Sequence, residues 1–197
     1  MEKTDIHNEV WLAPWDPEWQ HEFHLEKQFI IGALIDDGGS VAVWHVGSTS
    51  IKGMPAKPII DILVCPDKSV PLESCIPKLE RIGYRNLGEC GRAGRYFLSS
   101  GREPGKTFYA HLCYEDNPVA QDQLLFQKLL RDSEPLRARY RYTKQMLEGI
   151  FPDDQDMYRT VKGFFIEGVL AGYRQALSEC KERTALRAGL SDNDICD

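Results

Sequence analysis

Two short apolar runs, at residues 41–46 and 59–64, most constrain what this chain can fold into. Each run is too continuously apolar for a strand with one wet face, and is typical of a β-strand covered on both faces. The first run ends abruptly in the sequence Gly47-Ser48-Thr49-Ser50, and the second carries a single acid, Asp61, in its middle. Because a loop at the end of a buried strand is a common place for a ligand, these two strands are where we expect function.

The other segments predict a mixture of helices and strands. A helical pattern starts after Asp16, the expected N-cap, and Pro17, whose fixed φ suits a first turn. The remaining patterns predict a helix over 72–82, short strands at 84–87 and 95–98, a strand over 106–115, and helices at 118–132, 134–149 and 155–182. We therefore expect an α+β fold in which residues 1–182 form one domain and residues 183–197 form a polar, frayed tail.

Charge and cysteine content exclude several classes of protein. The 197 residues carry 24 Lys and Arg against 30 Asp and Glu, a formal net charge of -6, which disfavours binding to bulk nucleic acid. Six cysteines at irregular spacings, without a CxxC pair, predict reduced thiols. The most apolar helical stretch, residues 163–172, is interrupted by Glu167 and is far shorter than the ~20 residues that cross a bilayer. A cytoplasmic protein without a membrane partner is the expectation.

The Gly47-Ser48 pair and Asp61 have the residue types of a phosphate and metal site. A glycine lets backbone amides approach an anion, and the Ser48 hydroxyl adds a donor. A carboxylate at Asp61 can hold Mg²⁺ or Mn²⁺ together with the phosphates of a substrate. The alternatives are an ordinary strand-to-loop turn at Gly47-Ser48 and a buried acid satisfied by backbone amides or by Lys57.

The stretch from His45 to Val64, HVGSTSIKGMPAKPIIDILV, resembles the signature of the GrpB family, which is similar in fold to the nucleotidyltransferases. The resemblance extends over about residues 10–175 and includes the PWDPEW start, Arg95, His111-Leu112, the pair Tyr140 and Lys144, and the pair Tyr158 and Lys162. It implies a nucleotidyltransferase-like mixed β-sheet flanked by helices, with C-terminal helices. For activity it implies a nucleotidyltransferase-like role without a well-established substrate.

This sequence departs at two places from the patterns that the resemblance implies. An active nucleotidyltransferase usually carries a second acid two residues after the first, where this chain has Leu63. The later strand tends in the family to show His-x-His after a basic residue, whereas this chain has His111-Leu-Cys113 with Phe108 at the basic position. The first departure disfavours two-metal chemistry, and the second removes one histidine from any metal or phosphate role of that strand.

The remaining candidates come from the residues around these motifs. His111 and Glu115 lie on the polar face predicted for the 106–115 strand, so either completes a metal site with Asp61 if the two strands are neighbours. His45 lies in an apolar run and is better explained as a hydrogen-bonded core residue. The expected catalytic residues are Asp61 and Ser48, and the expected phosphate-binding residues are Gly47, Ser48, Thr49, Lys57, Arg95, Lys144 and Lys162.

Three functions remain open on the sequence. The leading one is a site for a nucleotide or another phosphate-bearing small molecule, with metal-dependent nucleotidyl transfer as its natural reaction. The second is a non-catalytic nucleotide sensor or binding module, which the missing second acid favours. The third is a metal-dependent phosphohydrolase built on Asp61, His111 and Glu115. The oligomeric state and the identity of substrate and acceptor are not readable from these patterns.

Overall fold

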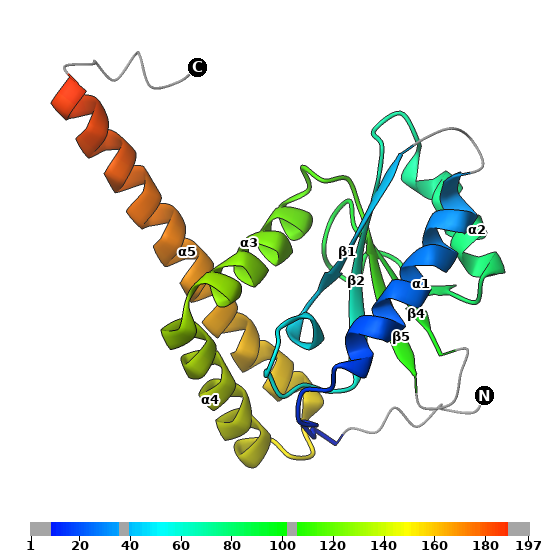
Figure 1. The fold of residues 1–197 in the computed structure, drawn as a ribbon, viewed down its shortest axis with the longest axis horizontal. Coiled ribbons are helices and arrows are strands. Elements are labelled where there is room, and N and C mark those ends of the chain that lie inside the picture. Colours follow the sequence, from blue (N-terminus) through cyan, green and yellow to red (C-terminus); the bar gives the residue numbers. More distant parts are fainter. Residues whose placement is uncertain (1–8, 36–39, 102–105, 189–197) are drawn as a thin grey trace.

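A computed structural model describes residues 9–35, 40–101 and 106–188, with side chains as far as residue 184 (Figure 1). Its elements, in chain order, are α1 (Glu18–Leu34), β1 (Val41–Val46), the 3₁₀ turn η2 (Ser48–Ser50), β2 (Ile59–Pro66), α2 (Leu72–Arg81), β3 (Arg85–Asn86), β4 (Tyr96–Ser100), β5 (Thr107–Leu112), α3 (Pro118–Asp132), α4 (Glu134–Ile150) and α5 (Gln155–Ala188). The predicted order of helices and strands is confirmed.

The strands form one mixed sheet in the order β1-β2-β5-β4-β3. Strand β2 pairs antiparallel with β1 and parallel with β5, while β5 pairs antiparallel with β4. The register places Asp61 between Val46 of β1 and Tyr109 of β5, and sets His111 beside Leu63. The strand that carries His111 is therefore a neighbour of the strand that carries Asp61, as a metal site shared by the two residues requires.

Helices α1 and α2 cover one face of the sheet (Figure 1). The α1 positions at helical spacing, Trp19, Phe23, Ile30 and Leu34, are all buried against the even-numbered positions 60, 62 and 64 of β2. Burying a side chain of this size contributes about 1.5–3 kcal/mol, so this layer is the principal core of the protein. In β5 the predicted alternation holds, because Phe108, Ala110 and Leu112 are buried and the residues between them are half-buried.

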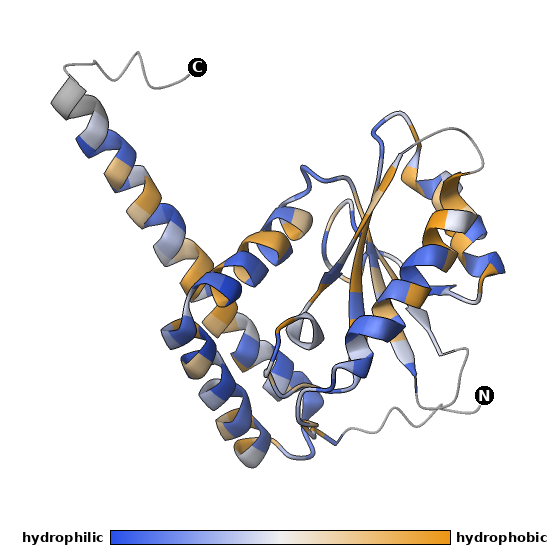
Figure 2. Cartoon of the chain, viewed as in Figure 1, coloured by the Kyte–Doolittle hydropathy of each residue, from blue (hydrophilic) through white to orange (hydrophobic). Residues whose placement is uncertain are grey.

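Helices α3, α4 and α5 lie on the other side of the sheet and have a smaller core of their own. Figure 2 shows hydrophobic residues running along β1 and β2, whereas hydrophobic and hydrophilic residues alternate along α5. Leu170 is the last buried residue of α5, and residues 171–184 are exposed.

Asp16 accepts a hydrogen bond from the Glu18 amide at 2.9 Å at the start of α1, which is the bond expected of a capping side chain. Local boundaries differ from the sequence expectations in two places. The strand predicted at 84–87 is shortened to Arg85–Asn86, although the Leu87 amide still donates to the carbonyl of Phe97. Helix α5 continues through Ala188, past the predicted domain boundary at 182, and the rest of the predicted tail lies outside the described residues.

The fold class is confirmed as α+β, with a mixed sheet flanked by helices and with C-terminal helices. Within the described residues no helix combines the length and apolarity that crossing a membrane requires. The five cysteines there are free thiols, of which Cys65, Cys75 and Cys113 are buried, as expected for reduced structural residues.

Candidate functional site

Two adjoining cavities lie between the sheet and the C-terminal helices, and both reach Asp61. The first, about 340 Å³, is called the α3 lobe and is lined by Gly47, Arg95, Val119, Asp122, Gln123, Phe126, Gln127, Leu130, Tyr140, Glu167 and Leu170. The second, about 440 Å³, is called the lysine lobe and is lined by Leu12, Thr49, Ala56, Lys57, Ile59, Phe97, Tyr109, Lys144, Tyr158 and Arg159. Both share Ser48, Asp61, Arg92, His111, Lys162, Gly163 and Ile166.

Asp61 and Gly47 are in direct contact at the junction of the two lobes. Gly47 has a φ of 69°, a conformation that side chains other than glycine rarely adopt. A Cβ placed on it would lie 2.3 Å from Oδ2 of Asp61. The missing side chain therefore lets the loop after β1 pass directly beside the carboxylate.

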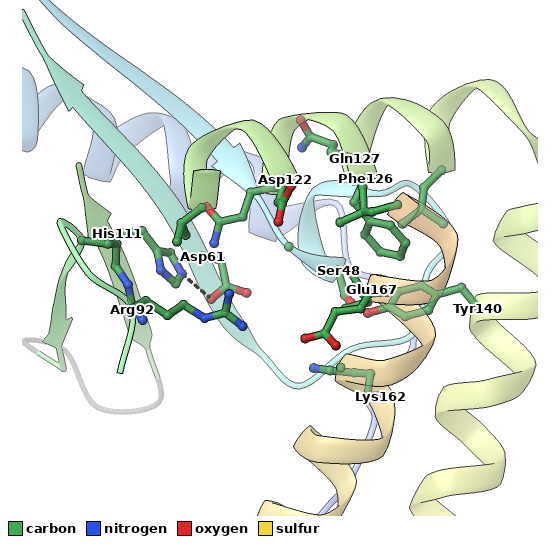
Figure 3. A pocket seen from close by; sticks show the side chains of 18 residues that line it. Ser48, Asp61, Arg92, His111, Asp122, Phe126, Gln127, Tyr140, Lys162 and Glu167 are labelled. Atoms are coloured by element: carbon green, nitrogen blue, oxygen red, sulfur yellow. Dashed lines mark hydrogen bonds and ion pairs between the residues drawn. The ribbon is translucent and has the colours of Figure 1, made fainter. Parts of the chain in front are cut away.

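His111 faces the other side of the same carboxylate. Its Nε2 lies 3.8 Å from Oδ1 of Asp61, the pair drawn with a dashed line in Figure 3. The imidazole packs on Phe97 with ring centroids 5.3 Å apart, and its Nδ1 is buried without a hydrogen-bond partner. The parallel pairing of β2 and β5 thus brings together two of the three residues expected to bind a metal.

Ser48 connects the sheet side of the site to helix α4. Its Oγ lies 3.4 Å from the hydroxyl of Tyr140, which is buried between Phe126 and Phe165. Burial raises the pKa of Tyr140 to about 12, so this phenol remains protonated at neutral pH and is available as a donor. Ser48 lines both lobes, as expected of a residue that contacts a ligand.

Thr49 and His45 form a buried pair that supports the loop after β1. The Thr49 hydroxyl donates to the carbonyl of Ile59 at 3.2 Å and therefore accepts from Nε2 of His45 at 3.0 Å. Burial lowers the pKa of His45 to about 4, which keeps the ring neutral. The prediction that His45 is a hydrogen-bonded core residue is confirmed, and the hydroxyl of Thr49 is engaged in holding the loop.

Two arginines from the loop before β4 reach the α3 lobe. Arg95 is 5% exposed, its guanidinium lies 5.1 Å from the ring of Phe97, and its Nε has no hydrogen-bond partner. Burial lowers the pKa of Arg95, because the charged guanidinium loses part of its hydration in the folded protein. Arg92 is exposed, and Figure 3 shows its side chain extending into the pocket toward Asp61. These are the planar donors that suit bidentate contact with a phosphate.

Three lysines line the lysine lobe, and two of them lie over the ring of Tyr158. The ammonium groups of Lys57 and Lys162 lie 5.6 Å and 5.4 Å from its ring centroid. Lys144 is 1% exposed and donates to the carbonyl of Pro55. Burial, followed by the neighbouring cations, lowers the pKa of Lys57 to about 8 and that of Lys144 to about 7. Burial also lowers the pKa of Lys162, and the charge of Asp61 partly opposes this shift.

Glu115, the third residue expected to bind a metal, is not brought to Asp61. Asp61 is opposite Tyr109 in the register, whereas Glu115 follows the end of β5, is exposed and lines neither lobe. The two side chains lie toward opposite ends of the paired strands, because each strand residue adds about 3.3 Å. Among residues 9–35, 40–101 and 106–188, no three His, Cys, Asp or Glu side chains are grouped so as to hold a metal.

Leu63 occupies the position of the missing second acid and is fully buried. It packs with Val46, Cys65 and Ala120, so the start of α3 covers this part of the sheet. An acid there would be buried in an apolar cluster.

Sequence reasoning overlooked the polar residues of α3. Gln127 is 7% exposed, and its amide donates to the carbonyl of His45 and, at 2.6 Å, to the hydroxyl of Ser50. Gln123, one turn earlier, lines the α3 lobe and has a buried Oε1 without a partner. The available signal was their spacing: both glutamines fall on the apolar stripe of the helix, where a polar side chain needs a partner.

A sequence model of the GrpB protein family matches residues 9–171. The protein UPF0157 PA4798 from Pseudomonas aeruginosa is 33% identical over 164 residues, which are 81% of this chain and 65% of that protein's length. This chain thus spans somewhat less than two thirds of that relative.

Two solved structures are similar. The crystal structure of the conserved protein GrpB from Enterococcus faecalis has a TM-score of 0.69 at 30% identity and covers 83% of this chain and 99% of that one. The poly(U) polymerase Cid1 has a TM-score of 0.47 at 12% identity, over 70% of this chain and 42% of that one, a likeness of fold alone. With its family model matched along most of its length, and with the site built on the predicted Gly-Ser loop and Asp61, this chain belongs to the GrpB family.

Proposed function

We propose that this protein binds a nucleotide or another phosphate-bearing small molecule in the α3 lobe and the lysine lobe. The observation that carries the proposal is the charge of the lining. Of the residues that the structure describes, six basic side chains line the two lobes (Lys57, Arg92, Arg95, Lys144, Arg159 and Lys162) against three carboxylates (Asp61, Asp122 and Glu167), in a chain whose formal net charge is -6. A cavity with the opposite sign from the rest of the molecule attracts anions selectively.

The residues at the junction are suited to holding phosphates. The loop at Gly47 offers backbone amides, and Ser48 and Tyr140 offer hydroxyl donors. Arg95 adds a buried guanidinium whose Nε lacks a partner, so a phosphate oxygen would supply the hydrogen bond that the protein does not. Lys162 lines both lobes and lies on the side of the cavity opposite Arg92 (Figure 3).

Asp61 and Ser48 would hold a divalent ion, Mg²⁺ or Mn²⁺, jointly with the phosphates of the ligand. Such an ion supplies charge neutralisation and polarises a phosphoryl group. His111, 3.8 Å from Asp61, would orient the carboxylate.

Binding without transfer is the function that the site supports best. Nucleotidyl transfer usually uses two metal ions, and the second requires a further acid beside Asp61. Here that position is Leu63, fully buried in an apolar cluster. The phosphohydrolase alternative was built on Asp61, His111 and Glu115, and of these Glu115 lines neither lobe. A nucleotide-binding or sensor module is therefore preferred to either enzyme.

A thermal-shift panel tests the proposal. The four ribonucleoside triphosphates are added with and without Mg²⁺ or Mn²⁺ to wild type, to Asp61→Asn and to the matched control Glu115→Gln. At a hundredfold excess over Kd, a ligand of the native state adds about 2.7 kcal/mol, which raises Tm by about 5–10 °C in a chain of this size. We expect a metal-dependent shift with at least one nucleotide, lost in Asp61→Asn and kept in Glu115→Gln.

Other outcomes separate the alternatives. Equal loss in both variants would show that the shift does not arise at Asp61. The absence of any shift, with every triphosphate and either metal, would contradict nucleotide binding. If binding is found, incubation with an α-phosphate-labelled nucleotide and a search for labelled product tests transfer, and we expect none.

A further inference from the structure

The lysine lobe is cationic on three sides. Lys57 enters it from the loop before β2, Lys144 from α4 and Lys162 from α5. Lys57 and Lys162 are held within 6 Å of the same Tyr158 ring, and Lys144 lies 5.1 Å from the ring of Tyr140. Arg159 and Arg92 line the same lobe, and Asp61 is its one carboxylate among the residues that the structure describes.

The three lysines lack the ion pairs that would normally offset such a cluster. In the described part of the chain, none of them has a carboxylate oxygen within 4.0 Å, and Arg159 has only an exposed partner, Asp156, at 3.8 Å. Like charges held together and withdrawn from water oppose folding. Side chains that merely stabilised the fold would not be arranged in this way, so the arrangement indicates an anionic ligand.

The two lobes differ in character. Both have apolar lining residues, and in the α3 lobe Phe126, Leu130 and Leu170 form a wall beside the unpartnered Gln123 Oε1, as an organic group requires. The difference is in charge: among the described residues, three cations face three carboxylates in the α3 lobe, whereas five cations face Asp61 alone in the lysine lobe. The junction between them is formed by Ser48, Asp61 and Lys162.

We propose that the lysine lobe is a polyphosphate subsite, which takes a chain of two or more linked phosphates, while the α3 lobe takes the organic part of the same ligand. This inference rests on the proposed function and names its substrate class. A single phosphate carries about -1.5 to -2 charges at neutral pH and neutralises only part of the cluster. A chain of phosphates brings further charges and extends from the junction at Asp61 to lysines on three different elements.

Isothermal titration calorimetry with inorganic probes tests the subsite without a base or sugar. Orthophosphate, pyrophosphate and tripolyphosphate are titrated into the full chain at pH 7 and constant ionic strength, alongside ATP. We expect affinity to increase with chain length, with tripolyphosphate bound at least tenfold more tightly than orthophosphate. If ATP binds more tightly than tripolyphosphate, the natural ligand is a nucleotide. If the two bind equally, the natural ligand is a free polyphosphate. Either result supports the polyphosphate subsite.

Three variants locate the binding. Lys57→Gln and Lys162→Gln each remove one charge from the lobe, and we expect each to weaken tripolyphosphate about tenfold and orthophosphate less. Lys68→Gln is the matched control, because Lys68 is exposed and pairs with Asp116 outside both lobes. Because each substitution removes one of several like charges, we expect Lys57→Gln and Lys162→Gln to be at least as resistant to urea as wild type. A loss of affinity in these variants is then not caused by unfolding.

Two results would overturn the inference in different ways. If ATP binds and depends on Asp61, but tripolyphosphate binds no better than orthophosphate, the polyphosphate subsite is wrong and the proposed function stands. If neither nucleotides nor any phosphate compound binds, both are wrong. Equal weakening by Lys68→Gln would show non-specific attraction and would also overturn the subsite.

Discussion

At the scale of single residues, Gly47 and Asp61 constrain each other more tightly than any other pair described in the site. The sequence suggested that Gly47 is a glycine so that backbone amides can approach an anion. The structure adds a second reason, because a Cβ on Gly47 would overlap the Asp61 carboxylate. The glycine therefore serves the acid of the site as well as its loop.

Replacing Gly47 by alanine tests this constraint. We expect Gly47→Ala to lower the free energy of unfolding by about 2–4 kcal/mol, from the left-handed φ and from displacement of Asp61. Gly53→Ala is the control, since Gly53 has a φ of 75° but open space where a Cβ would be, and should lose only about 1–2 kcal/mol. Urea denaturation measures the free energy of unfolding of both variants. Equal decreases would show that the overlap between the added Cβ and Asp61 does not contribute to the effect.

At the scale of elements, the side chain of Gln127 joins α3 by hydrogen bonds to β1 and to the loop that follows it. Gln127 donates to a backbone carbonyl of β1 and to the hydroxyl of Ser50, which itself donates to the carbonyl of Gly47 at 2.7 Å. This chain of bonds runs from the helix wall of the α3 lobe to the loop beside Asp61. The position of α3 and the shape of the Gly47 loop are therefore linked.

Removing the Gln127 amide should destabilise the protein and loosen the site. We expect Gln127→Ala to lower the free energy of unfolding by about 1–3 kcal/mol, because the carbonyl of His45 and the Ser50 hydroxyl lose a buried partner. Gln121→Ala, at an exposed position of the same helix, should change it by less than about 0.5 kcal/mol. Chemical denaturation of both variants measures the difference, and an unchanged Gln127→Ala would show that α3 is held without this bond.

At the scale of the whole molecule, the lysine lobe is where the sheet layer, the loop before β2 and the C-terminal helices meet. Lys144 is surrounded by Lys162, Arg141 and Glu148, with Tyr140 beneath it. Burial is the main cause of its lowered pKa, and the two cations add to it. The free protein thus carries a destabilising charge cluster where its layers join, whereas residues 171–184 of α5 are exposed.

This cluster predicts how stability depends on pH. The pKa is about 7 for Lys144 and about 8 for Lys57 in the folded state, below the value of about 10.5 in an unfolded chain. Between these values the unfolded state binds more protons, so the free energy of unfolding should rise as pH increases from about 7 toward 10. Above about 10 the raised pKa of Tyr140 acts in the opposite direction, because the unfolded tyrosine ionises first.

Urea denaturation at intervals from pH 6.5 to 10 measures this profile in wild type and in Lys144→Met. The variant keeps a buried side chain of similar length without the ammonium, so we expect a flatter rise between pH 7 and 10. Stability that falls over this interval in wild type, or that rises equally in the variant, would contradict the assignment.

Local patterns in the sequence determined most of the secondary structure and the first residues of the site. The apolar runs specify β1 and β2, the alternation at 106–115 specifies β5, and helical spacing specifies the helices, because each depends on residues a few positions apart. The motif around Gly47, Ser48 and Asp61 is equally local. These features were therefore readable without a structure.

Only the tertiary structure decided which distant residues share the site. The parallel pairing of β2 with β5 brings His111 to Asp61 and leaves Glu115 outside the site. The sequence had placed His111 and Glu115 on the same polar face of one strand and did not distinguish between them. The packing of α4 and α5 likewise brings Lys144 and Lys162 into one lobe with Lys57. The periodicity of a sequence indicates which face of a helix or strand a residue occupies. Which residues that face contacts is decided by strand register and helix packing, and both depend on contacts between segments far apart in the chain.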